Sequence, residues 1–188
     1  MILANHIGQK MKLENSIIRL ELLTEDDREF YNSIYTDDSL TRYISKPLSI
    51  SSSNKSFEVV IKKMSGIKSR LMIYKISSIV DNCNIGIIGL KWNCQHPDDA
   101  EIGIIILKQF QRKGLSHSSK TLLMQQAFNN LNTRKIIARC HKDNIPANKA
   151  NQKLGFKRVS EKMNSQIDSI QVTWEISQKD FRIMTHET

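Results

Sequence analysis

The stretch Gln111-Arg112-Lys113-Gly114-Leu115-Ser116 decides the fold, because it joins two segments with different periodicities. Residues 100–107, just before it, are nearly continuous in isoleucine, which predicts a strand that is buried on both faces. After it, one helical face is formed by Leu115, Leu122, Leu123, Ala127 and Leu131. The first turn of a helix leaves backbone N–H groups unpaired, and these groups bind phosphate together with the helix dipole. The stretch therefore predicts a strand, an anion-binding turn and a helix.

The side chains of this turn also favour an anion. Gly114 permits a positive φ and the close approach of a ligand. Arg112 and Lys113 add positive charge, and the small Ser116 keeps the turn open. Each dipole or exposed charge contact contributes only about 0.3–1 kcal/mol, whereas micromolar affinity needs about 8 kcal/mol. The turn alone therefore fits a simple strand-to-helix connection as well as it fits a phosphate site.

Other segments predict a mixed sheet with helices against it. Further strands are predicted from apolar, β-branched runs at residues 17–23, 71–80, 85–92, 135–140 and 167–176. Helices are expected after Thr24, which precedes three acids, from Lys55 to Met64, and from Pro146 to about Leu154. Residues 36–53 are expected to be a loop or a short helix.

The length and charge of the chain limit its class. A chain of 188 residues supports one domain with a substantial core, and 39% hydrophobic with 25% charged residues excludes wholesale disorder. We expect this domain at residues 13–180, with an N-terminal extension at 1–12 and a C-terminal tail at 181–188. The net charge of +9 favours a nucleotide cofactor, ribosomal RNA or an acidic protein as partner, although an ordinary basic surface explains it equally.

Cys83, Cys94 and Cys140 are far apart and lack the spacing of a metal site, so no metal is expected. An odd number of such cysteines favours a reduced cytoplasmic protein with buried thiols over a disulfide scaffold. No apolar run has the length of a secretion signal or a membrane span. The sequence therefore predicts a cytoplasmic protein that does not cross a membrane.

The order of strand, glycine turn, helix and strand, followed by Asn144 and Leu154-Gly155-Phe156, resembles the GNAT superfamily of acyl-coenzyme A N-acyltransferases. It is most similar to the branch of ribosomal-protein N-terminal acetyltransferases (RimJ/RimL-like). That family's acetyl-CoA loop is Gln/Arg-x-x-Gly-x-Gly/Ala, and residues 111–116 match it with serine at the last position. Over residues 17–176 the resemblance implies an α/β (α+β) fold. Its mixed, mostly antiparallel twisted sheet would have six to seven strands, helices on both faces and a splayed central strand pair.

The resemblance also implies how acetyl-CoA, the cosubstrate, is held. The cofactor-binding turn would be Gln111, Arg112, Lys113, Gly114, Leu115 and Ser116. The pantetheine arm would lie in the gap between the splayed strands and pair with the main chain of Ile104, Ile105 and Ile106. The side-chain amide of Asn144 would contact this arm, with an Asx turn or helix cap as the alternative.

Transfer of an acyl group from a thioester to an amine needs a neutral amine, a stabilised oxyanion and a proton for the thiolate. Deprotonating an α-amine at pH 7 costs about 1.4 kcal/mol, against about 4.6 kcal/mol for a lysine. Glu101 matches the family's acidic position and would act as a base through water, with a solvated carboxylate or a surface salt bridge as the alternative. The N–H near Ile106 would polarise the thioester carbonyl.

The proton donor is the main departure from the family pattern. Many members have a tyrosine seven residues after the asparagine, and this chain has Asn151 there, which cannot donate a proton near neutral pH. His141 or Cys140 would be local replacements, with a surface or capping role as the alternative for His141. Acceptor-site walls are expected at residues 36–53 and 161–168. Tyr43 and Trp92 are expected either to line that site or to pack in the core.

These patterns predict a cytoplasmic enzyme that moves an acetyl group from acetyl-CoA to a primary amine in a ternary complex. The amine would belong to a small molecule or to a protein N-terminus, and ribosome association and a monomer or homodimer are open. One alternative is a non-catalytic acyl-CoA-binding protein with a basic partner-binding surface. A plain nucleic-acid-binding domain is weaker, because aromatic residues are only 6% of the chain.

Overall fold

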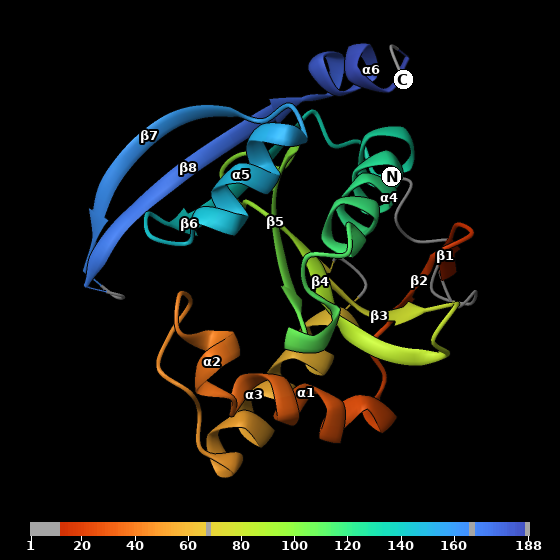
Figure 1. The fold of residues 1–188 in the computed structure, drawn as a ribbon, viewed down its shortest axis with the longest axis vertical. Helices are drawn as coiled ribbons and strands as arrows, with labels where there is room; N and C mark the ends of the chain where they lie inside the picture. Colours follow the sequence, from red (N-terminus) through yellow and green to blue (C-terminus); the bar gives the residue numbers. More distant parts are fainter. Residues whose placement is uncertain (1–11, 67–68, 166–167, 187–188) are drawn as a thin grey trace.

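The computed structural model describes residues 12–66, 69–165 and 168–186. Its strands form one sheet in the order β1-β2-β3-β4-β5-β6-β8-β7, and among the paired strands only β5 and β6 run parallel (Figure 1). The strands are β1 (Lys12–Glu14), β2 (Ile18–Leu22), β3 (Leu71–Ser78), β4 (Cys83–Trp92), β5 (Asp99–Ile106), β6 (Lys135–His141), β7 (Lys157–Asn164) and β8 (Ser169–Ser177). The predicted mixed, mostly antiparallel sheet is confirmed, with eight strands in place of six to seven.

The α-helices are α1 (Arg28–Tyr35), α2 (Asp38–Thr41), α3 (Ile50–Met64), α4 (Leu115–Asn130), α5 (Ile145–Lys153) and α6 (Gln178–His186). Two 3-10 turns, η2 (Glu25–Asp27) and η3 (Lys108–Phe110), precede α1 and the glycine turn. The predicted helix start at Thr24 is confirmed, because the Thr24 N–H donates to Asp27 Oδ2 over 2.9 Å. None of the described helices is both long and apolar enough to cross a bilayer.

The centre of the sheet opens between β5 and β6. These strands pair at only three positions, from Asp99 with Lys135 to Glu101 with Ile137. By contrast, β4 pairs with β5 over seven positions and β6 pairs with β8 over seven. The predicted splayed pair is therefore present, and it leaves the end of β5 without a neighbour on one side.

Alternation along β5 assigns its side chains to two faces. Ile102, Ile104 and Ile106 pack in the main core with α4, whereas Ile105 packs with α1 on the opposite face. Gly103 on that second face is exposed. The prediction of burial on both faces is thus right for the end of the strand and wrong at Gly103, because helices cover only part of the second face.

Strands β1 and β7 and helix α6 were not predicted. Strand β7 pairs with β8 along its length although its side chains are mostly exposed and polar, so it lacks the apolar pattern of a strand. Helix α6 begins before residue 181, and Phe181 packs on Phe128 with ring centroids 5.2 Å apart. At the other end, Lys12 belongs to β1, whereas residues 1–11 of the expected extension lie outside the described residues.

The three cysteines are all free thiols. The prediction of buried thiols holds for Cys140 but is wrong for Cys94, which is exposed, and Cys83 is half-buried. Cys94 lies in the turn between β4 and β5, where no element packs over it.

Candidate functional site

The glycine turn has an open, uncapped backbone. Gly114 is the N-cap of α4, with φ +76°, and no side chain caps the helix. A Cβ added at Gly114 would meet no atom within 4 Å outside its own chain neighbours and helix backbone, so the turn is open on that side. Arg112 also has a positive φ, of 63°. Because α4 has sixteen residues and no side chain caps its first N–H groups, the turn suits an anion.

The side chains of the turn divide into binding candidates and packing residues. Arg112 and Lys113 are exposed at the turn, and the Lys113 ammonium lies 5.2 Å from the Phe110 ring centroid. Gln111 Nε2 instead donates to the Ile106 carbonyl over 2.8 Å, which ties the turn to the end of β5. Leu115 is buried in the core and Ser116 is half-buried. Leu115 can therefore offer a ligand only its backbone.

Glu101 is placed at the mouth of the opening between β5 and β6, on the face opposite the main core. Its carboxylate forms an ion pair with the Arg139 guanidinium of β6. The two side chains are 39% and 36% exposed, so the pair contributes at most about 1 kcal/mol and opens easily. The surface-pair alternative is thus realised, and Arg139 is a neighbour that sequence analysis missed. Alternation after Ile137 was the signal that could have found it.

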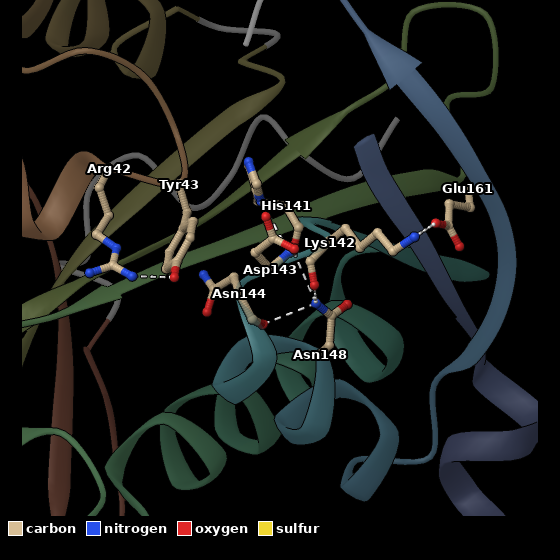
Figure 2. Close-up of polar contacts among 8 residues, drawn as sticks. All are labelled: Arg42, Tyr43, His141, Lys142, Asp143, Asn144, Asn148 and Glu161. Carbon is tan, nitrogen blue, oxygen red and sulfur yellow. Dashed lines mark hydrogen bonds and ion pairs between the residues drawn. The ribbon is translucent and has the colours of Figure 1, made fainter. Parts of the chain in front are cut away.

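His141 ends β6 on the same face as Glu101 and Arg139. Its Nδ1 accepts a hydrogen bond from the Asp143 backbone N–H over 3.1 Å, so a neutral ring carries its proton on Nε2. The Tyr43 ring lies 5.2 Å from the His141 ring, and the Tyr43 hydroxyl bonds to Arg42 (Figure 2). The segment after α2 therefore reaches across to the end of β6.

Asn144 caps helix α5. Its Oδ1 accepts from the Ala147 N–H over 3.2 Å, so the predicted capping alternative is present. Asn148 Nδ2 donates to the carbonyls of His141 and Asn144, and this fixes the loop shown in Figure 2. The contact of Asn144 with a pantetheine arm stays a prediction.

Asn151 belongs to a buried polar cluster on the other side of β6. Lys120 Nζ donates to Asn151 Oδ1 over 2.6 Å, and Asn151 Nδ2 donates to Cys140 Sγ over 3.1 Å. Asn151 is 0% exposed and Lys120 only 4%. Burial lowers the pKa of Lys120 to about 8 and raises the pKa of the Cys140 thiol. Sequence analysis missed Lys120, although its spacing of three and seven residues before Leu123 and Ala127 places it on the buried stripe of α4.

An open groove of about 640 Å³ adjoins the Glu101–Arg139 pair. Arg139 lines one side of it, and the remaining lining residues come from β7, the residue that follows it and β8: Val159, Ser160, Lys162, Met163, Asn164, Ser165, Gln171, Thr173 and Glu175. Part of the expected acceptor region at 161–168 is therefore in this groove. Trp92 instead packs against the core and donates from Nε1 to Thr133 Oγ1 over 3.1 Å, which makes it a packing residue.

Within the described ranges, no group of three or more His, Cys, Asp or Glu side chains could hold a metal ion. The polar groups of this region are the uncapped amides of the turn, the Glu101–Arg139 ion pair, His141 and the buried Lys120 amine. Such a set can bind an anion, orient an amine and move protons.

Comparison with curated proteins and solved structures agrees with this geometry. YnaD of Bacillus subtilis (strain 168), named as an uncharacterized N-acetyltransferase, is 30% identical over 79 residues, or 42% of this chain. The match spans 45% of that relative, less than half of its length. A spermidine N-acetyltransferase from Vibrio cholerae, solved with CoA and spermine, has a TM-score of 0.77 at 20% identity and covers 89% of this chain and 99% of its own.

Apo FdhC, a nucleotide-linked sugar GNAT, also has a TM-score of 0.77, at 19% identity, over 95% of this chain and 97% of its own. At such identities the likeness shows a shared fold. A model of the GNAT acetyltransferase domain matches residues 18–157, which is most of the chain. The protein therefore belongs to the GNAT acetyltransferase family.

Proposed function

We propose that this protein transfers the acetyl group of acetyl-CoA to a primary amine by direct attack in a ternary complex. The observation that carries the proposal is the joint placement of the open glycine turn and the splayed strands. A turn alone binds a phosphate, whereas an unpaired strand edge leading away from it supports a longer ligand.

The coenzyme would be held along that edge. The amides after Gly114 would bind its pyrophosphate, with Arg112 and Lys113 adding charge, and the main chain of residues 104–106 would pair with its arm. Acetyl-CoA supplies an acetyl group activated as a thioester. The N–H near Ile106 would polarise the thioester carbonyl.

The amine would enter from the face that carries the groove. Glu101 would accept the amine proton through water once its pair with Arg139 opens. His141 lies on this same face, beside Tyr43, so its position favours contact with the amine over protonation of the sulfur. The proposal uses no cysteine nucleophile: burial raises the pKa of the Cys140 thiol and so disfavours its thiolate.

We propose an α-amine as acceptor, in keeping with the resemblance to ribosomal-protein N-terminal acetyltransferases. A weak base such as Glu101 is sufficient for an amine with a pKa near 8. The groove is open enough for an extended peptide, and it places Arg139 and Lys162 against a single carboxylate, Glu175. This charge balance does not favour a polyamine.

The test uses the purified full chain with acetyl-CoA and a panel of peptide α-amines, amino acids, aminoglycosides and spermidine, with acetylated product measured by mass spectrometry. We expect product from α-amines and less from spermidine. Faster acetylation of spermidine would contradict the proposed acceptor class, and no product from any amine would contradict catalysis.

Gly114→Glu tests the coenzyme site separately. The new carboxylate fills the open space and repels phosphate, so calorimetry should show loss of acetyl-CoA binding. Gly66→Glu is the matched control, because Gly66 is exposed, has no positive φ and lies beyond the end of α3. Undiminished affinity of the Gly114→Glu variant would remove the turn from the site.

A non-catalytic acyl-CoA-binding protein is the second candidate, favoured by the fully buried Asn151 at the usual tyrosine position and by the +9 charge. A rise in melting temperature with acetyl-CoA, together with no product across the amine panel, would select this function. Salt-dependent retention of RNA would add a basic partner-binding surface to it.

A further inference from the structure

The ammonium of Lys120 is a buried charge for which the structure shows no carboxylate partner. Its hydrogen-bond partner is the neutral Asn151 amide, and the titratable group acting on it is the Cys140 thiol. Lysines are almost never fully buried unless they are paired, because removing an ammonium from water is costly. Among the described residues nothing neutralises this charge, so an anion from outside the chain would complete the cluster.

The cluster also lies where such an anion would arrive. Cys140 is three residues beyond Ile137, the last residue of β6 that pairs with β5. Lys120 is one helical turn beyond Ser116, on the helix that begins at the anion-binding turn. Asn151 occupies the position at which many family members have the tyrosine acid. Hydrogen bonds among α4, α5 and β6 thus hold the ammonium on the core face of the part of β6 that does not pair with β5.

We propose that Lys120 is the proton donor to the departing coenzyme A thiolate, in place of the missing tyrosine. This inference rests on the proposed acetyl transfer. Asn151 positions the ammonium through its Oδ1.

The step balances as follows. The amine nitrogen forms a bond to the acetyl carbon, and the bond from that carbon to sulfur breaks, with its electron pair passing to sulfur. Lys120 Nζ gives one proton to this sulfur and becomes a neutral amine. The acceptor nitrogen loses one proton through water to Glu101. After the products leave, Glu101 releases this proton to solvent and solvent returns a proton to Lys120.

The neighbouring acids are less suited to this role. Burial raises the pKa of the Cys140 thiol, whereas it lowers that of Lys120, so the ammonium gives up its proton more readily. At pH 7 an amine with a pKa of about 8 is still mostly protonated. His141 and Tyr43 lie on the opposite face of β6, beside the acceptor groove.

The direct test measures the pKa of the thiol of bound coenzyme A from the ultraviolet absorbance of its thiolate. The complex with desulfo-coenzyme A is subtracted to remove the protein's own cysteines. A cation within reach of the sulfur lowers a thiol pKa by about one unit or more. The thiolate fraction should therefore be at least about tenfold higher in the wild type than in Lys120→Met, with Lys149→Met, an exposed lysine on α5, behaving as wild type.

Equal thiol pKa values in the wild type and in Lys120→Met would overturn the proposal. If Lys120→Met does not fold, the wild type is compared with free coenzyme A. A bound thiol pKa equal to or above that of free coenzyme A would also overturn the proposal. Absence of any acetylated product in the wild type would instead overturn the proposed function, and the inference with it.

Kinetics provide a second readout with the best amine from the panel. Lys120→Met should lower kcat by about 100-fold and remove the fall of kcat at alkaline pH, with little change in coenzyme affinity. The double variant Lys120→Ala/Asn151→Tyr restores the family's usual acid and should regain at least about tenfold. Turnover unchanged in Lys120→Met would assign the proton to another donor.

Discussion

The two faces of the sheet beside the splayed strands β5 and β6 carry charges in different environments. On the groove face, Glu101 and Arg139 neutralise each other while both stay partly in water. On the core face, Lys120 is buried, and its polar neighbours among the described residues are the Asn151 amide and the Cys140 thiol. A paired, exposed charge changes the free energy of folding little, whereas an unpaired, buried charge opposes folding. The second arrangement therefore points more strongly to function.

The magnitudes support this ranking. An exposed ion pair contributes about 0–1 kcal/mol. The lowering of the Lys120 pKa from 10.5 to about 8 corresponds to a cost of about 3 kcal/mol for the charged form. This cost is a large fraction of the usual stability of a domain.

The largest expected effect is on the pH dependence of stability. The pKa of Lys120 is lowered in the folded state, so between pH 8 and 10.5 the unfolded chain binds more protons and the free energy of unfolding rises with pH. The cost is fully present below pH 8 and is gone above 10.5. Relative to Lys120→Met, the wild type should therefore gain about 3 kcal/mol across this window in chemical denaturation. A constant difference would show that Lys120 is solvated and would break the contrast between the faces.

Removal of the amide partner should have the next largest effect. Asn151→Leu leaves the Lys120 ammonium without its hydrogen bond, which should lower the free energy of unfolding at pH 7 by about 2–3 kcal/mol. The exposed Asn130 on α4 gives the control variant Asn130→Leu, expected within about 0.5 kcal/mol of wild type. Equal stabilities of the two variants would mean that the cluster contributes nothing to the core.

On the groove face, Glu101→Gln should act on turnover instead of stability. It should lower kcat by at least about tenfold while leaving the acetyl-CoA affinity nearly unchanged, because the base is lost and the turn is intact. Single-turnover kinetics and calorimetry measure the two quantities. Unchanged turnover would remove Glu101 from the mechanism.

The smallest effect is expected for Arg139→Met, which should change the free energy of unfolding by less than about 1 kcal/mol. Its methylene groups keep their packing on the sheet while the exposed ion pair is lost. Denaturant titration at low and high salt would check this value. A fall of more than about 2 kcal/mol in the free energy of unfolding would mean that the groove face contributes as much to stability as the core face.

Local patterns predicted most of the fold. Isoleucine-rich β5, the glycine turn and the buried stripe of α4 depend on residues close in sequence, and each was found where expected. The polar strand β7 was missed because it has no apolar pattern of its own. Its hydrogen bonds to β8 make it a strand. The splayed strand pair was predicted from the family resemblance, and the short pairing between β5 and β6 confirmed it.

The candidate site was predicted less completely, for a related reason. Glu101 and Arg139 are 38 residues apart, and Lys120 and Asn151 are 31 apart, so no short spacing reveals either pair. The roles expected for residues 104–106, Asn144 and His141 stay predictions to be tested with the coenzyme.

By itself, the sequence determined the order of the elements, the turn at Gly114 and the absence of the usual tyrosine at position 151, since backbone preference and residue identity are local properties. Only the tertiary structure decided which charges meet water and which do not. Lysine is usually a surface residue, but the packing of α4, α5 and β6 buries Lys120 and lowers its pKa to about 8. Burial depends on distant segments closing over a side chain, and that depends on the whole fold.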